Sequence, residues 1–575
     1  MPDPRALVPD PDGFHLLNLA IHIAAGLTLF GVLRRTFQSA VLPPALGQHA
    51  TALAGSIALL WLVHPLQTGS VTYIVQRVEA LMGLFLLLTL YCSIRALDSR
   101  VQARWSLAAV AACALGMGVK ETMAGAPLIV VAWDWLFNGT GAHRKAPSSQ
   151  RSAPNAQRPL PNAQRPFFYI ALASTWLILA WNVSSGSRAA SVGFGFAEWP
   201  WWRYLITQAG VLLHYLRLAF APAPLVLDYG WPPAQSPAAE LPEVTIIGGL
   251  LALTIFGLVK RSPLAFPAAL FFIVLAPSSS VLPIVTEVAA EHRMYIPLAA
   301  VLSLTVVGVF LLGWRLHVPT WAAIGAVVVI AGIFGTLTYA RNRDYASEEQ
   351  IWADTIWKRP SNPRARTNYG VLLLARQKWR EAESHLRAAV ALNPKDAKAH
   401  VALGATLCST NRCAEGIQHF KRGSEINPND VDAIRNLAEA YAARGQLRES
   451  ADYFRRALTI VPDDVFMLNQ ASWLLATAAR DDVRDGDAAL AMAERAVRLT
   501  HRTDPTSLDS LAVAYAELGR FEEAQQAIEE ALAVALRTGA RRLEPDLLNH
   551  RALIQARQKI RAAPVPRGPE SIQKP

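Results

Sequence analysis

The first candidates for chemistry are four ionisable side chains in one short stretch: Glu287, Glu291, His292 and Arg293. The stretch reads APSSSVLPIVTEVAAEHRMYIP and separates two apolar segments, Leu264–Leu275 and Ile296–Leu312. Charges this close to a bilayer are costly unless they pair, reach water or bind something. The cluster therefore predicts either a site at the membrane surface or a loop whose charges only anchor it there.

Further polar residues lie at the ends of other apolar segments, and the expected topology puts them on the same outer side: His64, Arg77, Glu79, Lys120, Glu121, Asp228 and Tyr295. Taken singly, each is compatible with an anchor or an intramolecular ion pair. Taken together, they suggest an outward-facing site. Arginine and lysine there would suit a lipid phosphate, and a carboxylate would deprotonate an acceptor hydroxyl.

The elements that must position these residues follow from an uneven distribution of charge. Residues 1–340 hold 20 Lys and Arg and 13 Asp and Glu, whereas residues 341–575 hold 35 and 31. The first part carries runs of about 15–20 apolar residues, near the length that a bilayer requires. We expect an all-α chain with ten spans, followed by a soluble domain: Phe14–Leu33, Ala50–Val63, Ala80–Ile94, Trp105–Val119, Met123–Phe137, Phe167–Trp181, Val244–Val259, Leu264–Leu275, Ile296–Leu312 and Trp321–Tyr339.

The Lys and Arg bias of the short loops gives the orientation. Arg34 and Arg35, the basic loop 143–165, and Lys260 with Arg261 are expected in the cytoplasm, and both termini outside. This alternation requires Trp201–Phe220 to lie in the membrane interface. If this segment spanned the membrane, the orientation of every later segment would be inverted. The net charge of +11 is spread over both parts without a dense basic stripe, which argues against nucleic acid as a partner.

The soluble part has a repeat of 34 residues, marked by Pro360, Pro394, Pro428 and Pro462. This is the tetratricopeptide period. Small residues recur at one position of the first helix, large ones three residues later, and aromatic or aliphatic ones in the second helix: Gly370, Gly404 and Ala438; Leu373, Leu407 and Tyr441; Leu386, Phe420 and Phe454. We expect about five repeats and a closing helix over 362–562, a connector over 341–361 and a disordered tail over 563–575.

Tetratricopeptide arrays bind extended peptides in a concave face, where Asn368 and Asn436 are candidates for contacts with a peptide backbone. The predicted partner of this part is thus a protein or peptide. Cys408 and Cys413 are five residues apart, and a disulfide and two free thiols are both compatible with the sequence. No cysteine spacing indicates a metal site.

Several long motifs resemble a known family: GFHLLNLAIH, WLVHPLQTGSVTYIVQRVEALMGLFLLLTLY, GMGVKE, YLRLAFAPAPLVLDYGWP and LAPSSSVLPIVTEVAAEHRMYIPLAA. They are similar to segments of bacterial multi-spanning proteins with C-terminal tetratricopeptide repeats, which look like relatives of the transmembrane O-mannosyltransferases. The resemblance implies the GT-C glycosyltransferase architecture in a bacterial inner membrane, with the repeats on the periplasmic side. It also implies a polyprenyl-phosphate-linked sugar, mannose-like, as donor substrate.

On this resemblance, the donor phosphate would be bound by Arg77, Lys120, His292 and Arg293, and Glu79 or Glu291 would assist the chemistry. The chain departs from the family in two ways. It begins where the first external loop, with its catalytic acid, would end, so the N-terminus looks incomplete. The segment around Gly69 also has glycine where the family usually has glutamate.

Two functions from different classes follow. The first is a glycosyltransferase that moves a sugar from the polyprenyl-phosphate donor to a protein held by the repeats, if the missing loop is supplied. The second is a catalytically inactive, membrane-anchored repeat scaffold for protein interactions. A transporter is less favoured, because the paired broken segments of inverted repeats are absent from the sequence pattern.

Overall fold

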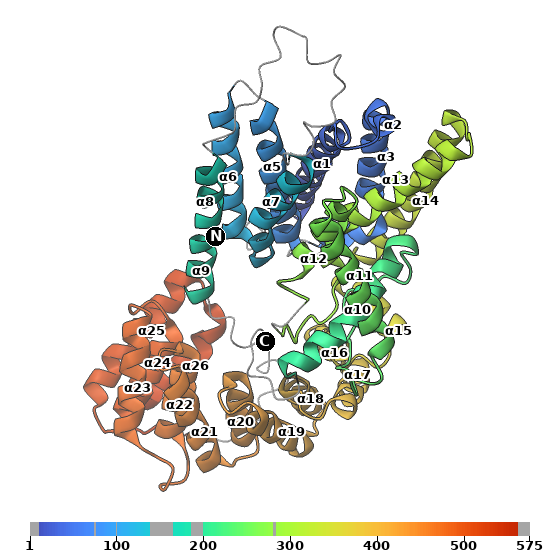
Figure 1. Ribbon diagram of the computed structural model, residues 1–575. Coiled ribbons are helices and arrows are strands. Elements are labelled where there is room, and N and C mark those ends of the chain that lie inside the picture. The colour runs from blue at the N-terminus through green and yellow to red at the C-terminus, as the bar shows by residue number, and fades with distance from the viewer. Residues whose placement is uncertain are drawn as a thin grey trace. The chain divides into compact units, whose positions relative to one another are not determined.

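The computed structural model describes residues 11–73, 76–98, 101–138, 165–185, 199–279 and 283–561. Within these ranges the chain is helical and contains no strand, as the sequence predicts (Figure 1). It divides into two compact units, Met1–Pro360 and Ser361–Pro575. Most of the basic loop 143–165, and the tail predicted over 563–575, lie outside the described residues.

The first unit consists of apolar helices joined by short turns: α1 (Pro11–Phe37), α2 (Pro44–Gln48), α3 (Ala50–Val63), η2 (Pro65–Gln67), α4 (Thr68–Val71), α5 (Arg77–Asp98), α6 (Gln102–Val119), η4 (Glu121–Gly125), α7 (Ala126–Phe137), α8 (Arg165–Ser174), α9 (Trp176–Ser185), α10 (Trp201–Phe220), α11 (Leu241–Val259), α12 (Ala265–Leu275), η8 (Glu291–Met294), α13 (Pro297–Arg315), α14 (Thr320–Asp344) and α15 (Glu348–Lys358). The connector expected over 341–361 is occupied mainly by α15, which belongs to this unit.

All ten segments expected to span are helical, but fewer meet the length and hydropathy of a span. Six described helices are long and apolar enough, or seven if the bent pair α3 and 65–71 counts as one. The others are too short or too polar by themselves: α12 has only 11 residues. The expected count of ten spans is thus larger than the number of helices that satisfy these criteria.

The core of the first unit forms where α1 contacts α3 and α5, and α13 contacts α3 and α12. At its centre Trp61 Nε1 donates a hydrogen bond of 2.7 Å to the carbonyl of Tyr295, and both side chains are fully buried. Two glycines permit close packing: a Cβ on Gly83 would meet the Tyr295 ring at 2.5 Å, and one on Gly26 would meet Leu62 at 2.5 Å. These contacts hold the loop before α13 against α3 and α5.

The segment of uncertain topology, Trp201–Phe220, is one continuous helix, α10. Its buried residues recur every three or four positions, as expected of an amphipathic helix. The opposite face exposes Trp201, Trp202 and Phe220. It does not meet the length and hydropathy criteria for a span, and its location in the membrane interface stays a prediction.

The second unit is a row of five helix pairs and a closing helix: α16 (Pro363–Ala375) and α17 (Trp379–Leu392); α18 (Ala397–Ser409) and α19 (Cys413–Ile426); α20 (Val431–Ala443) and α21 (Leu447–Ile460); α22 (Val465–Thr477) and α23 (Gly486–Leu499); α24 (Pro505–Glu517) and α25 (Phe521–Thr538); η9 (Arg541–Leu543) and α26 (Glu544–Gln555). Figure 1 shows the pairs following one another along this unit.

Each pair begins in the same way. Asn362, Asp396, Asp430, Asp464 and Asp504 each accept a hydrogen bond from a backbone N–H in the first turn of the helix that follows. Such N-caps satisfy donors that the helix leaves unpaired. The first four caps are 34 residues apart, so the repeat period is also the period of helix starts.

The predicted small and large positions also match the structure. A Cβ on Gly404 would lie 2.7 Å from the Phe420 ring, and one on Gly370 would lie 2.6 Å from Leu386. Phe420 and Leu386 are fully buried. The small residue therefore lets the two helices of a pair approach until the large residue of the second fills the space.

In four of the five pairs the turn between the two helices contains a residue with a left-handed backbone, and Gln377 is a poor residue for this conformation. Gln377 has φ +61°, whereas Gly445 and Gly519 occupy corresponding turns with φ +72° and +76°. An L-residue pays about 1 kcal/mol for this conformation, and glycine does not. We expect Gln377→Gly to raise the free energy of unfolding of the second unit by about 0.5 kcal/mol, measured by urea denaturation. Gly445→Ala should lower it, and equal effects of both substitutions would contradict the argument.

Candidate functional site

The structure brings three of the predicted site residues together: Glu79, Lys120 and His292. Lys120 Nζ forms an ion pair with Glu79 Oε1, and His292 Nε2 lies 3.9 Å from the same oxygen. Glu287 Oε2 lies 3.5 Å from His292 Nε2 and is the most exposed member. We call these four residues the Lys120 cluster. It joins α5, the end of α6 and the loop before α13, which are far apart in the sequence.

Helix ends place the charged members of this cluster favourably. Glu79 is in the first turn of α5, and Lys120 directly follows the last residue of α6. A carboxylate is stabilised at a helix N-terminus and a cation at a C-terminus. Glu79 is 1% exposed, whereas the Lys120 side chain is 18% exposed. The cluster thus has a buried carboxylate and a cation that reaches toward the surface.

Arg293 makes its contacts within its own loop, and its predicted contact with a donor phosphate stays a prediction. Its guanidinium is buried and donates hydrogen bonds to three backbone carbonyls of its own loop, those of Ser278 (3.1 Å), Val288 (3.3 Å) and Glu287. These bonds use three of the five N–H groups of the guanidinium. In this arrangement Arg293 fixes the loop that carries His292 and Glu287.

Glu291 lies in a separate buried pocket. Its Oε1 accepts hydrogen bonds from the backbone N–H of Val226 and from the Tyr229 hydroxyl at 2.8 Å. Burial raises the pKa of Glu291, although both hydrogen bonds and the positive charges of Arg341 and Lys358 oppose the rise. Asp228, also buried, accepts a hydrogen bond of 3.0 Å from Gly230 N. Glu291 therefore ties η8 to the loop after α10, and it does not join the Lys120 cluster.

Most of the other predicted outer-face residues form hydrogen bonds or ring contacts within the first unit. His64 Nε2 lies 3.2 Å from the Ala219 carbonyl, and the Tyr295 hydroxyl lies 2.9 Å from His22 Nδ1. Arg77 Nε donates to Asn18 Oδ1 at 2.9 Å, and its guanidinium lies over the Phe14 ring. Glu121, half-buried in η4, follows Lys120 directly. Of this group, Arg77 and Glu121 keep partly exposed side chains.

His292 should make the stability of the first unit sensitive to acid. Burial, and then the charges of Lys120 and Arg293, hold the pKa of His292 well below its ordinary value of 6.5. Below pH 6.5 the unfolded chain binds a proton that the folded chain does not, so stability falls as the pH falls. We expect His292 to contribute a loss of about 1 kcal/mol between pH 7 and pH 5.5. Thermal unfolding in detergent at several pH values measures the total loss of stability, and His292→Gln should reduce that loss by the contribution of His292.

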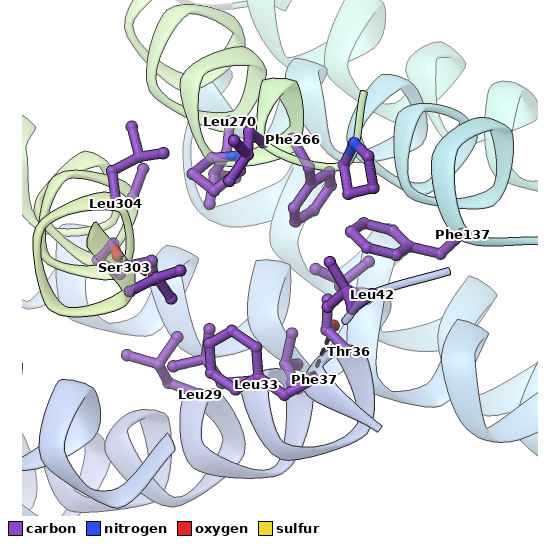
Figure 2. A pocket seen from close by; sticks show the side chains of 18 of the residues that line it. Leu29, Leu33, Thr36, Phe37, Leu42, Phe137, Phe266, Leu270, Ser303 and Leu304 are labelled. Atoms are coloured by element: carbon purple, nitrogen blue, oxygen red, sulfur yellow. Dashed lines mark hydrogen bonds between the residues drawn. The ribbon is translucent and has the colours of Figure 1, made fainter. Parts of the chain in front are cut away.

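The first unit also contains an apolar cavity of about 70 Å³ between α1, α5, α12 and α13 (Figure 2). Only Thr36 and Ser303 bring hydroxyls to its lining. Both donate within their own helices, Thr36 to Val32 O and Ser303 to Ala299 O. The lining therefore offers a phosphate neither a cation nor a free side-chain donor, and the cavity does not fit the charged headgroup of the predicted donor. Among the described residues, no group of three or more His, Cys, Asp or Glu side chains is placed to hold a metal ion.

The second unit has a larger cavity of about 610 Å³, which α20, α22, α24 and α26 line. Neither predicted groove residue is part of it. Asn368 Oδ1 instead accepts a hydrogen bond from Lys398 Nζ at 3.1 Å in the first two repeats, and Asn436 lies on α20 outside the lining. We call this space the solenoid cavity. Its polar lining includes Asn469, Asp509 and His550.

Sequence reasoning missed these lining residues for two reasons: Asn469 lies one residue before the 34-residue equivalent of Asn436, and Asp509 follows the insertion in the fourth repeat. Asn469 and Asp509 both occupy the fifth residue of a first helix, in α22 and α24. A register taken from the helix starts would have aligned Asp509 with Asn469 across the insertion. Asp509 Oδ1 pairs with His550 Nδ1 at 2.9 Å, and the His550 ring lies 5.1 Å from the Trp473 ring.

Cys408 and Cys413 are joined by a disulfide between the end of α18 and the start of α19. The sequence left this pairing open. The other two cysteines, Cys92 and Cys113, are free and buried in the first unit.

Comparison with known proteins identifies the repeats. Residues 370–431, 409–465 and 506–538 match family models of the tetratricopeptide repeat. The second unit is therefore a tetratricopeptide repeat domain, a class of protein-interaction module. The predicted relationship to O-mannosyltransferases and the GT-C architecture has no counterpart among these matches, and no curated protein sequence matches the chain.

Several solved structures are similar to the second unit. YrrB, described as a tetratricopeptide repeat protein with an unusual peptide-binding site, is 17% identical over 32% of this chain and 93% of its own, with a TM-score of 0.29. A thermophilic tetratricopeptide repeat protein of Thermus thermophilus is 21% identical over 34% and 98%, with a TM-score of 0.25. PilF of Pseudomonas aeruginosa is 15% identical over 34% and 89%, with a TM-score of 0.26.

Proposed function

We propose that the chain is a membrane-anchored protein that holds a segment of a partner protein in its tetratricopeptide repeats. The observation that carries this proposal is the solenoid cavity, about 610 Å³ in a repeat domain of a protein-binding class. Ligand-binding cavities typically have about 300–1,000 Å³. The six helices with the length and hydropathy of spans support the anchoring role of the first unit.

The proposed location is a bacterial inner membrane, with the repeats on its periplasmic side. The basic loops of the first unit support this orientation by the positive-inside rule. The Cys408–Cys413 disulfide also supports it, because such bonds persist in the periplasm and are rare in the cytosol.

Membrane extraction and thiol labelling test the location. The protein should stay in membranes washed with alkaline carbonate. A single cysteine at Ser361, in a variant with the four native cysteines replaced, should react with a membrane-impermeant maleimide in intact spheroplasts. Release by carbonate, or labelling only after lysis, would contradict the proposed location.

Partner binding is tested by cross-linking the full chain in native membranes and identifying the attached peptides by mass spectrometry. Partner peptides should attach to residues of the solenoid cavity. Attachment confined to the first unit would contradict the proposed function of the repeats.

A second candidate function is glycosyl transfer from a polyprenyl-phosphate-linked sugar, mannose-like, to the protein held by the repeats. The Lys120 cluster favours it, because Lys120 and His292 place a cation and an imidazole beside the buried Glu79 carboxylate, and Lys120 and Glu287 reach toward the surface. In this proposal Lys120 binds the donor phosphate. Arg77 is close to Glu79 in the sequence. Glu79 assists the acceptor hydroxyl as a base.

Sugar transfer tests this candidate directly. Membranes with the protein should move radiolabelled mannose from polyprenyl-phosphate mannose to protein, and membranes with Lys120→Arg should retain more activity than those with Glu79→Gln. Transfer equal to that of membranes without the protein would eliminate the candidate and leave the binding function.

A further inference from the structure

The lining of the solenoid cavity has an uneven charge. Three carboxylates come from three different helices: Glu439 on α20, Asp509 on α24 and Asp546 on α26. Arg561 is the one guanidinium among the residues that line the cavity, and it pairs with Glu517. With histidine neutral, the lining carries a formal charge of −3 + 1 = −2. A positively charged ligand is therefore favoured.

Asp546 is the carboxylate most open to a ligand. It is exposed in the first turn of α26 and forms no ion pair with any residue that the structure describes. Asp509, in contrast, is paired with His550. A cationic side chain that enters the cavity can therefore pair with Asp546.

Asn469 gives a second, independent indication of a ligand. Its side chain lines the cavity and is 7% exposed. Nδ2 donates to Ser507 Oγ at 3.0 Å, which fixes the amide, but Oδ1 has no hydrogen-bond partner among the described residues. Buried acceptors are nearly always satisfied, and a peptide N–H is a donor that a bound chain would bring.

Apolar side chains also line the cavity, beside further polar ones. The rings of Phe466 and Trp473 and the side chain of Leu553 face the same space, and Phe466 is 44% exposed. Large exposed aromatic groups beside carboxylates suit a ligand with apolar and cationic side chains close together.

We propose that the solenoid cavity binds an extended segment of a partner protein that carries Lys or Arg next to a large apolar side chain. Asp546 pairs with the cation, Asn469 Oδ1 accepts a backbone N–H, and Phe466 and Trp473 cover the apolar side chain. This inference rests on the proposed protein-binding function and specifies its ligand.

Fluorescence anisotropy with the full-length protein in detergent micelles tests the inference. Two labelled probe peptides are compared, GALKAFRALG and its acidic counterpart GALEAFEALG. The basic probe should bind at least about tenfold more tightly, and its affinity should fall as salt is added. Asp546→Lys should weaken the binding of the basic probe about tenfold. Asn469→Leu should weaken this binding less.

Asp487→Lys is the matched control. Asp487 is also an exposed aspartate in the first turn of a helix, α23, but it does not line the cavity. The Asp487→Lys substitution should leave the affinity for the basic probe unchanged. Equal binding of both probes, an unchanged affinity of Asp546→Lys, or no binding of either probe would overturn the inference. Partner cross-linking in native membranes would still decide the proposed function separately, because it does not depend on the charge of the segment.

Discussion

Lys120→Met should destabilise the first unit by about 3 kcal/mol, because it leaves Glu79 buried without its cation. The two free cysteines, Cys92 and Cys113, are buried in the first unit, so a thiol-reactive fluorophore reports its thermal unfolding without interference from the second. The melting temperature measured in this way should fall by several degrees.

Glu79→Gln supplies the control for this prediction. The double variant Lys120→Met, Glu79→Gln removes both charges and should recover most of the loss, since an uncharged pair of similar volume is often as stable as a buried ion pair. Additive losses in the double variant would show that the two side chains act independently, which contradicts the ion pair.

Arg293→Met is expected to cost about 2 kcal/mol of stability in the first unit, because three hydrogen bonds to the carbonyls of Ser278, Glu287 and Val288 are lost. The Glu287 carbonyl loses its donor, whereas those of Ser278 and Val288 keep a second one, the Tyr204 hydroxyl and the Gln208 amide. Arg293→Lys keeps the charge, but a single amine does not reproduce the fork of the guanidinium, and we expect an intermediate loss. The same thermal assay measures both variants.

The alternative role of Arg293, contact with a donor phosphate, predicts a different pattern. In that case Arg293→Lys and Arg293→Met would keep the melting temperature of the wild type and lose only substrate binding. A wild-type melting temperature for Arg293→Met would therefore contradict the positioning role that the hydrogen bonds indicate.

The helices and the repeats could be predicted because their signals are local. Apolar length located all ten helical segments, and the 34-residue period located the repeat pairs, including the packing of Gly404 on Phe420. The number of helices with the properties of a span was overestimated. Segments such as α12 are apolar but short, and only the structure shows where they end.

The candidate site could be predicted only in part, because it depends on long-range packing. Loop topology placed Glu79, Lys120 and His292 on one side, but it did not distinguish them from Glu291, which turns into a separate pocket. Residue type suggested a phosphate ligand for Arg293, and the carbonyls that it binds are invisible in a sequence. Asn469 was missed because it lies one residue before the position equivalent to Asn368 and Asn436, and Asp509 because the insertion in the fourth repeat shifts its register.

The most direct test of the central claim, that the repeats of this membrane-anchored protein hold a partner segment, is photo-cross-linking in native membranes. Benzoylphenylalanine replaces either Phe466, which lines the solenoid cavity, or Leu536, which is exposed on α25 outside it. A discrete protein adduct at position 466, absent at position 536, is the result that we predict. No adduct at 466, or the same adducts at both positions, would contradict the claim.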